Sequence, residues 1–272
     1  MRGGGLWLVT LAVVWGCKSA DSGVTPQGAT TPGPTEAGSG GASSMKRRAP
    51  DAGSTAAARA SSSAAAPEEP EPKQAYRIAA VGDSLTDAKS FGGGYLAYVQ
   101  RRCPETRIDN FAKGGHMLNQ IRREFEARVH NQPRGTYSHV IVWGGVNDLY
   151  SDLTAGRTPQ KAASDLAIIY EKARSKGAKL VALTVSPWGG FKRYHNPRRQ
   201  AYTLELNGWI KEQLEAGKVD HVVDAYALLS CGAEERLCPA YQQRTPDGLH
   251  LGKQGHEVLG KALFEAVFQN CR

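Results

Sequence analysis

The sequence predicts an α/β fold in which a parallel sheet is covered by helices on both faces. From Tyr76 onward, short apolar runs alternate with longer stretches that have helical apolar spacing. Residues 140–142 and 180–183 are apolar throughout, which is typical of strands that are buried on both faces. Small and polar residues follow the runs, and sites in open parallel sheets form beyond the carboxyl ends of the strands.

The elements follow in order along the chain. The expected strands are residues 78–81, 107–111, 139–143, 179–185 and 221–224, and the expected helices are 95–102, 118–129, 159–176, 199–214 and 255–268. Gly177 stands where a helix C-cap is expected. The stretch from Tyr76 to Arg272 has about 200 residues, enough for one substantial core. Residues 76–272 are therefore expected to form a single domain.

The N-terminus has the pattern of an export signal. Residues 6–15 (LWLVTLAVVW) are an apolar run too short to span a bilayer but suited to the core of a signal peptide. Residues 14–17 (VWGC) resemble a bacterial lipobox, in which Cys17 becomes the lipidated first residue of the mature protein. Trp15 departs from the small or aliphatic residue usual there, and the alternative is an ordinary secretory signal with a chance cysteine. The sequence thus predicts a signal peptide over 1–17 and a lipoprotein of the cell envelope, anchored to the membrane at its N-terminus.

Residues 18–75 are of low complexity, rich first in Gly, Thr and Pro, then in Ala and Ser, then in Pro and Glu. Too few apolar side chains are present to offset the entropy of ordering, which predicts a disordered linker. The chain has a formal charge of +8, and nearly all of the excess lies after residue 75. Such a domain could attract nucleic acid, anionic lipid or an acidic polymer. Because no long Lys/Arg run or nucleic-acid motif occurs there, we expect no nucleic-acid partner, and we expect a monomer.

Four cysteines follow Cys17 and allow three disulfide connectivities. In an exported protein an even count indicates disulfides. Cys231 and Cys238 enclose a compact polar loop that a local bond could close, and Cys103 would then pair with Cys271. A metal site is the alternative, but no CxxC occurs and no histidine lies close to these cysteines in the sequence, so no metal is expected.

Three residues have the chemistry of a nucleophilic triad. Ser84 directly follows the first predicted strand, His250 can take its proton, and Asp247 lies three residues before that histidine. The aspartate can hold the imidazole in the required tautomer and stabilise its charged form. The backbone N–H of Ser84, the N–H of Gly115 and the side-chain amide of Asn147 can together form an oxyanion hole.

These residues resemble a known family. The order Gly-Asp-Ser-Leu (82–85), a glycine after the second strand, Gly-x-Asn-Asp (145–148) and Asp-x-x-His (247–250) is similar to the motif blocks of the SGNH (GDSL) hydrolases. In this comparison Ser84, Gly115, Asn147 and His250 match the four residues that name the family, and Asp247 matches the triad acid. The spacing from Asn110 favours Gly115 over the adjacent Gly114.

The resemblance implies a flavodoxin-like three-layer α/β/α sandwich with a five-stranded parallel sheet, and hydrolysis of esters or thioesters without a metal or other cofactor. No Gly-x-Ser-x-Gly is present, which argues against an α/β-hydrolase elbow. We also expect Asp83 and Asp148 to bond loop amides and Leu85 to pack inward. The histidines at 116, 195 and 256 lack an acid at useful spacing and are expected to be non-catalytic.

The substrate is predicted only as an ester of a small molecule, a glycan or a lipid. Residues 188–199 are aromatic and basic, and they either shape a pocket for an anionic substrate or form a solvated face. Residues 91–95 are expected to be flexible and to line the mouth of the site, with Tyr150 at its rim. The alternative function is a catalytically inactive binding lipoprotein that keeps the same fold.

Overall fold

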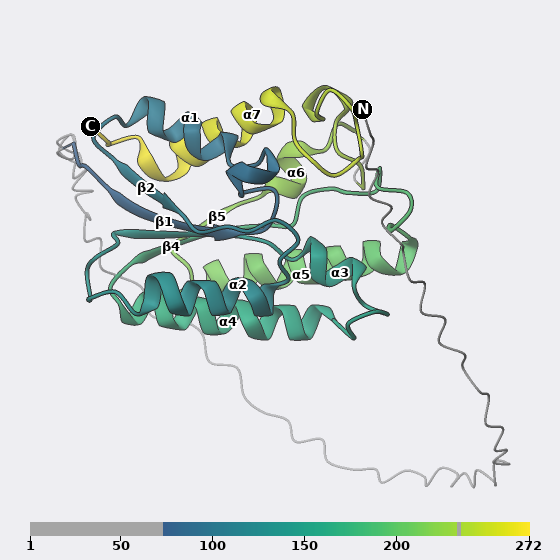
Figure 1. Cartoon of the computed structure of the whole chain (residues 1–272), viewed down its shortest axis with the longest axis horizontal. Helices are drawn as coiled ribbons and strands as arrows, with labels where there is room; N and C mark the ends of the chain where they lie inside the picture. Colours follow the sequence, from purple (N-terminus) through teal and green to yellow (C-terminus); the bar gives the residue numbers. More distant parts are fainter. Residues whose placement is uncertain (1–72, 233–234) are drawn as a thin grey trace, which may run out of the picture. The chain divides into compact units, whose positions relative to one another are not determined.

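A five-stranded parallel sheet lies at the centre of the computed structural model, which describes residues 73–232 and 235–272 (Figure 1). The strands are β1 (Arg77–Gly82), β2 (Arg107–Asn110), β3 (His139–Trp143), β4 (Lys179–Leu183) and β5 (His221–Val223). They are ordered β2-β1-β3-β4-β5, and every pair is parallel. The predicted fold class is confirmed. The expected signal peptide with Cys17, and the expected linker up to residue 72, lie outside the described residues.

Helices cover both faces of the sheet. Figure 1 shows α1 (Gly94–Arg102) and α7 (Lys253–Leu263) on one face, and α2 (Leu118–Phe125), α4 (Pro159–Ser175) and α5 (Pro197–Glu215) on the other. The short helices α3 (Val146–Tyr150) and α6 (Ala225–Leu229) were not predicted. One π-helical turn follows α2 and another follows α7, so both helical stretches reach the predicted length. None of the helices in the described part of the chain is long and apolar enough to cross a membrane.

Local sequence signals set the ends of the two longest helices. Before α4, the Thr158 hydroxyl accepts a hydrogen bond from the Lys161 N–H at 3.2 Å. Before α5, Asn196 accepts from the Arg199 N–H at 3.0 Å. Both helices have proline as their first residue, where no N–H is needed. Gly177, with a φ of +80°, follows the end of α4 as predicted.

The strands alternate their side chains between two apolar cores. In β1, Ala79 and Val81 join the core beneath α2, α4 and α5, while Ile78 and Ala80 join the core beneath α1 and α7. All five residues of β3 are buried, which explains why its sequence is almost continuously apolar. The buried Trp143 indole donates a hydrogen bond to the Thr184 carbonyl at 3.0 Å, so its polar atom is satisfied.

The strand order creates a crevice at the carboxyl end of β1. The chain leaves β1 through α1 to reach β2 on one side, then crosses by α2 on the opposite face to reach β3 on the other side. At such a switch point the two connections diverge and leave space between them. The residues that follow β1 and β3 therefore meet in this crevice.

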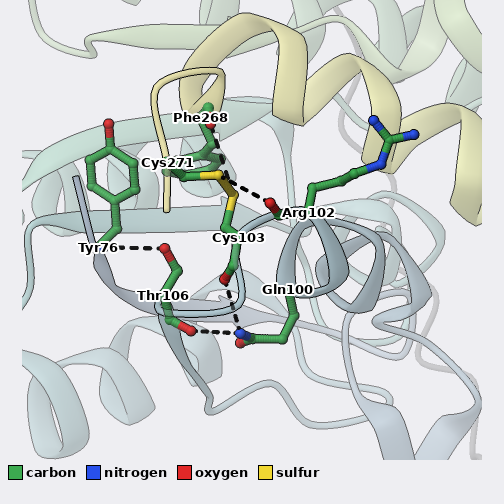
Figure 2. Close-up of a disulfide and its surroundings, with 7 residues drawn as sticks. All are labelled: Tyr76, Gln100, Arg102, Cys103, Thr106, Phe268 and Cys271. Atoms are coloured by element: carbon green, nitrogen blue, oxygen red, sulfur yellow. Dashed lines mark hydrogen bonds between the residues drawn. A yellow bond between two sulfur atoms is a disulfide. The ribbon is translucent and has the colours of Figure 1, made fainter. Parts of the chain in front are cut away.

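A disulfide joins the end of α1 to the C-terminus, as expected. Cys103 is bonded to Cys271, and Figure 2 shows the sulfur atoms between the last residues of α1 and the segment after α7. Gln74 pairs with Cys271 through its backbone, and the Arg272 side chain donates to the Lys73 carbonyl at 2.9 Å. Lys73 and Gln74, which the sequence placed in the linker, thus belong to the folded unit.

The expected bond between Cys231 and Cys238 is absent, and both are free thiols. The two thiols are hydrogen bonded to each other, which raises the pKa of Cys231. Backbone pairing of Ser230 with Leu237, and the hydrogen bond from the Cys238 N–H to the Leu229 carbonyl, bring the cysteines together. The backbone pairing therefore closes this loop without a covalent bond.

We expect the paired substitution of Cys103 and Cys271 with serine to lower the free energy of unfolding by about 2–5 kcal/mol, because the bond links residues 168 positions apart and restricts the unfolded chain. Urea unfolding at equilibrium measures the change. The matched control replaces Cys231 and Cys238 with serine and should cost much less. Equal losses in the two double variants would contradict this prediction.

Candidate active site

Ser84 lies just beyond β1 in a tightly packed turn. A Cβ on Gly82 would lie 2.4 Å from the Trp143 carbonyl oxygen, so only glycine fits where the chain leaves the sheet. Asp83 is fully buried, and its Oδ1 accepts a hydrogen bond from the Leu85 N–H at 3.0 Å. Leu85 is buried in the core beneath α1 and α7, as predicted. The turn is thereby held on both sides of Ser84, whose side chain is partly exposed.

Ser84, His250 and Asp247 form a continuous hydrogen-bonded chain. Ser84 Oγ lies 2.9 Å from His250 Nε2, and His250 Nδ1 lies 2.6 Å from Asp247 Oδ2. Asp247 Oδ1 also accepts from the backbone N–H groups of Leu249 and His250 at 2.9 and 2.8 Å. Burial alone would raise the pKa of Asp247, but its hydrogen bonds with the His250 ring and these N–H groups hold the pKa below its usual value. The carboxylate stays ionised beside the imidazole.

The turn that carries Asp247 and His250 rests on a glycine-rich segment after β4. Gly248 has a φ of +81°, and a Cβ on it would lie 2.1 Å from the carbonyl carbon of Gly190. Such an approach excludes any side chain at this position. The backbone of residues 190 and 191 therefore sets the place of Asp247 and His250.

The two other predicted oxyanion residues lie on neighbouring segments. Gly115 is exposed with a φ of +76°, and a Cβ on it would meet no atom within 4 Å. Asn147, in α3, is 4% exposed, and its Nδ2 donates to the His116 carbonyl at 2.9 Å. The space beside Gly115 is open, so a substrate atom can approach its backbone.

A buried carboxylate joins these two segments. Asp148 Oδ2 accepts from the Leu118 N–H, the first residue of α2, at 2.8 Å. Its Oδ1 accepts from Arg157 Nε at 2.7 Å, and Arg157 also pairs with Asp165 at 2.6 Å. A fully buried charge requires such partners. The segment after β3 thus holds the segment after β2 at both His116 and Leu118, just after the turn that contains Gly115.

Asp83 differs from Asp148 because half of its carboxyl group is unsatisfied. Its Oδ2 has no hydrogen-bond partner among the described residues. Burial raises the pKa of Asp83 to about 7, against the lowering effects of the Leu85 N–H and the His250 ring. A protonation change next to Ser84 therefore falls within the physiological range.

Several contacts at the site had no clear signal in the sequence. Arg157 follows Asp148 by nine residues in a loop without periodicity, so its partnership was not foreseen. Asp87 could have been recognised as a capping residue before the turn at Ala88–Ser90. Its Oδ2 accepts from the Gly114 N–H at 2.9 Å and so fixes the residue before Gly115.

The aromatic and basic segment after β4 is partly a packed platform and partly exposed. Trp188 is fully buried, and its indole donates to Thr203 Oγ1 at 2.9 Å. Arg199 is buried and donates to Asp152 through its Nε at 3.0 Å. Lys192 and Arg193 are exposed. The predicted solvated face therefore describes Lys192 and Arg193 but not Trp188 or Arg199.

Tyr150 packs against this platform, with its ring 5.3 Å from that of Tyr194.

The three histidines that were expected to be non-catalytic make contacts other than those of the Ser84–His250–Asp247 chain. The His116 carbonyl accepts from Asn147, and the His195 ring bonds Gln200 at 3.0 Å. Burial lowers the pKa of His256 to about 4, and its ring stacks on Tyr95.

Two surface cavities lie beside segments of the candidate site. One of about 450 Å³ is lined by Asp247, Gly248 and Arg236, together with both free cysteines. The other, of about 550 Å³, is lined by Asp87, Lys89, Lys113 and Arg128 around Phe111. Among the residues that the structure describes, no group of three or more His, Cys, Asp or Glu side chains is placed to hold a metal ion.

Comparisons with known proteins concern the family and the fold of the chain. Residues 80–258 match the model of the GDSL-like lipase/acylhydrolase family, from β1 into α7. A search of the curated proteins gave no match.

Three solved structures illustrate the shared fold. A GDSL-like lipase from Bacteroides thetaiotaomicron is 19% identical, with a TM-score of 0.58 over 70% of this chain and 86% of its own. A variant of an acetyl-xylooligosaccharide esterase from Geobacillus is also 19% identical, with a TM-score of 0.57 over 71% of this chain and 94% of its own. A lipase/acylhydrolase from Enterococcus faecalis is 20% identical, with a TM-score of 0.56 over 70% of this chain and 94% of its own. At these identities the likeness concerns the fold.

We expect the pH dependence of stability to change when Asp83 is replaced by asparagine, which keeps the acceptor for Leu85 but cannot ionise. The folded protein binds the Asp83 proton more tightly than the unfolded chain, where the ordinary pKa is 3.8. The stability from this proton is complete below that value and is lost as the pH rises through about 7.

The free energy of unfolding of the wild type should therefore fall relative to Asp83→Asn between pH 5 and pH 8, by at most about 1.4 kcal/mol per pH unit. Urea titrations at each pH measure the difference. Parallel profiles for the two proteins would show that Asp83 does not titrate in this range.

Proposed function

Since the chain belongs to the GDSL-like lipase/acylhydrolase family and is a hydrolase that acts on ester bonds, we propose that it cleaves its substrate with Ser84 as nucleophile, His250 as base and Asp247 as the group that orients the base. The observation that supports this proposal is the continuous chain of hydrogen bonds at 2.9 and 2.6 Å from the serine hydroxyl to the carboxylate. These distances are suitable for proton transfer.

In the first step, Ser84 Oγ attacks the ester carbonyl carbon while its proton passes to His250 Nε2. The tetrahedral intermediate then collapses, the bond to the alcohol oxygen breaks, and His250 returns the proton to the departing alcohol. An acyl group is left on Ser84. Water, deprotonated by His250, attacks this acyl-enzyme and releases the acid, which restores the serine. The lowered pKa of Asp247 keeps its carboxylate ionised. This carboxylate stabilises the imidazolium formed in each step.

We assign the oxyanion to the backbone N–H groups of Ser84 and Gly115 and to the side-chain amide of Asn147. Asn147 has two N–H donors, of which one already binds the His116 carbonyl. That bond fixes the orientation of the amide, so its second N–H is held in place before substrate binds. A donor of this kind typically lowers the barrier by roughly 2.7–4 kcal/mol.

The alternative is a binding lipoprotein that has lost catalysis. It would require the serine and histidine to be misaligned, with more than about 4 Å between the hydroxyl and the imidazole, beyond hydrogen-bond reach. The 2.9 Å contact of Ser84 with His250 favours the enzyme over this alternative.

Export and membrane anchoring remain part of the proposal. They are supported by the pattern of residues 1–17 and by the Cys103–Cys271 disulfide, a bond typical of oxidising compartments. The substrate is proposed as an ester of a small molecule, a glycan or a lipid. The Geobacillus neighbour is an acetyl-xylooligosaccharide esterase, so acetylated glycans belong in a substrate series beside esters of increasing acyl length.

Ser84→Ala should lower the kcat for p-nitrophenyl acetate by on the order of a thousandfold or more, because no other group can form the acyl-enzyme. Ser164→Ala is the matched control, since that hydroxyl donates within α4 to the Gln160 carbonyl. Initial rates of the purified full chains measure the effect. Equal turnover by wild type and Ser84→Ala would refute the role of Ser84.

Cys17→Ser should prevent lipidation when the chain is made in a bacterial host. The wild type should then appear in the membrane fraction with a lipid-modified Cys17 at its N-terminus, and the variant should not. Fractionation and mass spectrometry of the mature protein make the comparison. A mature wild-type chain that begins elsewhere and has no lipid would contradict the anchor.

A further inference from the structure

Phe91 is an exposed aromatic residue in an unusual backbone conformation close to Ser84. It is 87% exposed, the highest value among the exposed large apolar residues that the structure describes. Its φ of +62° lies in the left-handed region, and every other described residue with positive φ is a glycine. A bulky side chain is unfavourable in this region, and a ring left in water gains nothing from burial. Retained strain of this kind is characteristic of functional sites.

The turn that presents Phe91 is tied down by hydrogen bonds, although the sequence predicted a flexible segment. Asp87 Oδ1 accepts from the Lys89 N–H, and its Oδ2 accepts from Ser90 Oγ, both at 2.9 Å. The Gly92 N–H donates to the Asp87 carbonyl at 2.9 Å. Residues on both sides of Phe91 are thus fixed to one carboxyl-bearing residue.

Close packing places this turn at the rim of the candidate active site. A Cβ on Gly92 would lie 2.2 Å from the Ser84 carbonyl oxygen, and a Cβ on Gly114 would lie 2.4 Å from Ser90 Oγ. The turn therefore fills the space between the nucleophile's backbone and the segment that contains Gly115. Phe91 lies between Ser90 and Gly92 in the sequence. It therefore lies beside both the Ser84 backbone and the segment that contains Gly115.

Leu153 is a second projecting apolar side chain at the same edge of the sheet. It is 76% exposed, on the loop after β3 and α3. Because β1 and β3 are neighbouring parallel strands, the loops that follow them leave the sheet at one edge. Lys89, beside the first loop, and Arg193, after β4, are exposed cations at this edge.

We propose that Phe91 and Leu153 form a lipid-contact face, in which both side chains enter the apolar region of an anionic lipid surface while Lys89 and Arg193 meet its head groups. The inference rests on the proposed function, because it brings an ester held in that surface to Ser84.

The outward projection of the Phe91 and Leu153 side chains favours a lipid surface over a soluble ligand as the partner of this face. The cavity of about 550 Å³ next to the turn is lined by Asp87, Ala88 and Lys89 but not by Phe91. A side chain that recognises a small ligand is normally part of an enclosing pocket. Apolar side chains that project among cations match the layered chemistry of an anionic membrane surface.

Tryptophan fluorescence tests the contact directly. Phe91→Trp in the full chain is compared with Leu214→Trp, whose site is a 44% exposed leucine near the end of α5, toward the opposite edge of the sheet. Both are mixed with phosphatidylglycerol/phosphatidylcholine vesicles with and without brominated acyl chains, and the wild-type signal of five tryptophans is subtracted. An N-terminal anchor would bring both variants to the vesicles equally.

We expect a blue shift and quenching by bromine for the tryptophan at 91, both weakened by salt, and neither for the tryptophan at 214. No response at 91, or the same response at both positions, would overturn the proposal.

Phe91→Gly separates lipid contact from a structural role. Glycine adopts positive φ without strain, so we expect a higher Tm. We also expect the ratio of rates for a vesicle-borne long-chain p-nitrophenyl ester and soluble p-nitrophenyl acetate to fall roughly tenfold. Leu214→Ser should leave this ratio unchanged. A lower Tm with an unchanged ratio would make Phe91 a structural residue and overturn the proposal. A wild type that cleaves neither ester would refute the proposed function, and fluorescence would then decide lipid contact alone.

Discussion

The bonds made by the buried Asp148 carboxylate hold the candidate active site together. One oxygen accepts from the first N–H of α2 and the other from Arg157, so the segments after β2 and β3 are joined beneath the surface. Asn147 adds a bond to the His116 carbonyl from the adjacent position. Without these contacts the glycine and the amide assigned to the oxyanion would depend on two independent loops. A parallel sheet brings such loops near each other, but only specific bonds fix their relative positions.

Two carboxyl groups, Asp83 and Asp148, lie buried behind Ser84 and differ in how they are satisfied. Asp148 has an arginine and a backbone N–H, whereas Asp83 has one N–H and an oxygen without a partner. An unpaired charge in the interior is costly, so Asp83 retains its proton up to a pH of about 7. The arrangement keeps negative charge away from the Ser84 hydroxyl, the proposed nucleophile, while Asp247, close to the solvent, stays ionised beside His250.

The sequence predicted the sheet, the layers and the residues that meet at its carboxyl edge because these follow from short-range patterns. Apolar runs mark β1 to β5, and the residues directly after β1 and β3 must share the crevice. Contacts that depend on tertiary packing could not be predicted from the sequence. Arg157 has no pattern that links it to Asp148, and spacing alone does not reveal the backbone pairing of Ser230 with Leu237 or that Cys231 and Cys238 are free. The left-handed Phe91 was missed because only glycine and asparagine normally signal that conformation.

The joined ends of the folded unit affect how tension would be transmitted. Lys73 and Gln74 are bonded to the last residues of the chain, and the disulfide ties that segment to the end of α1 (Figure 2). A pull on the chain ahead of Lys73 would therefore enter at the amino edge of the sheet and pass into a covalently closed corner. Ser84 and His250 lie at the opposite edge, with β1 between them and this corner. Their 2.9 Å contact lies at the far end of β1 from the place where such tension would enter.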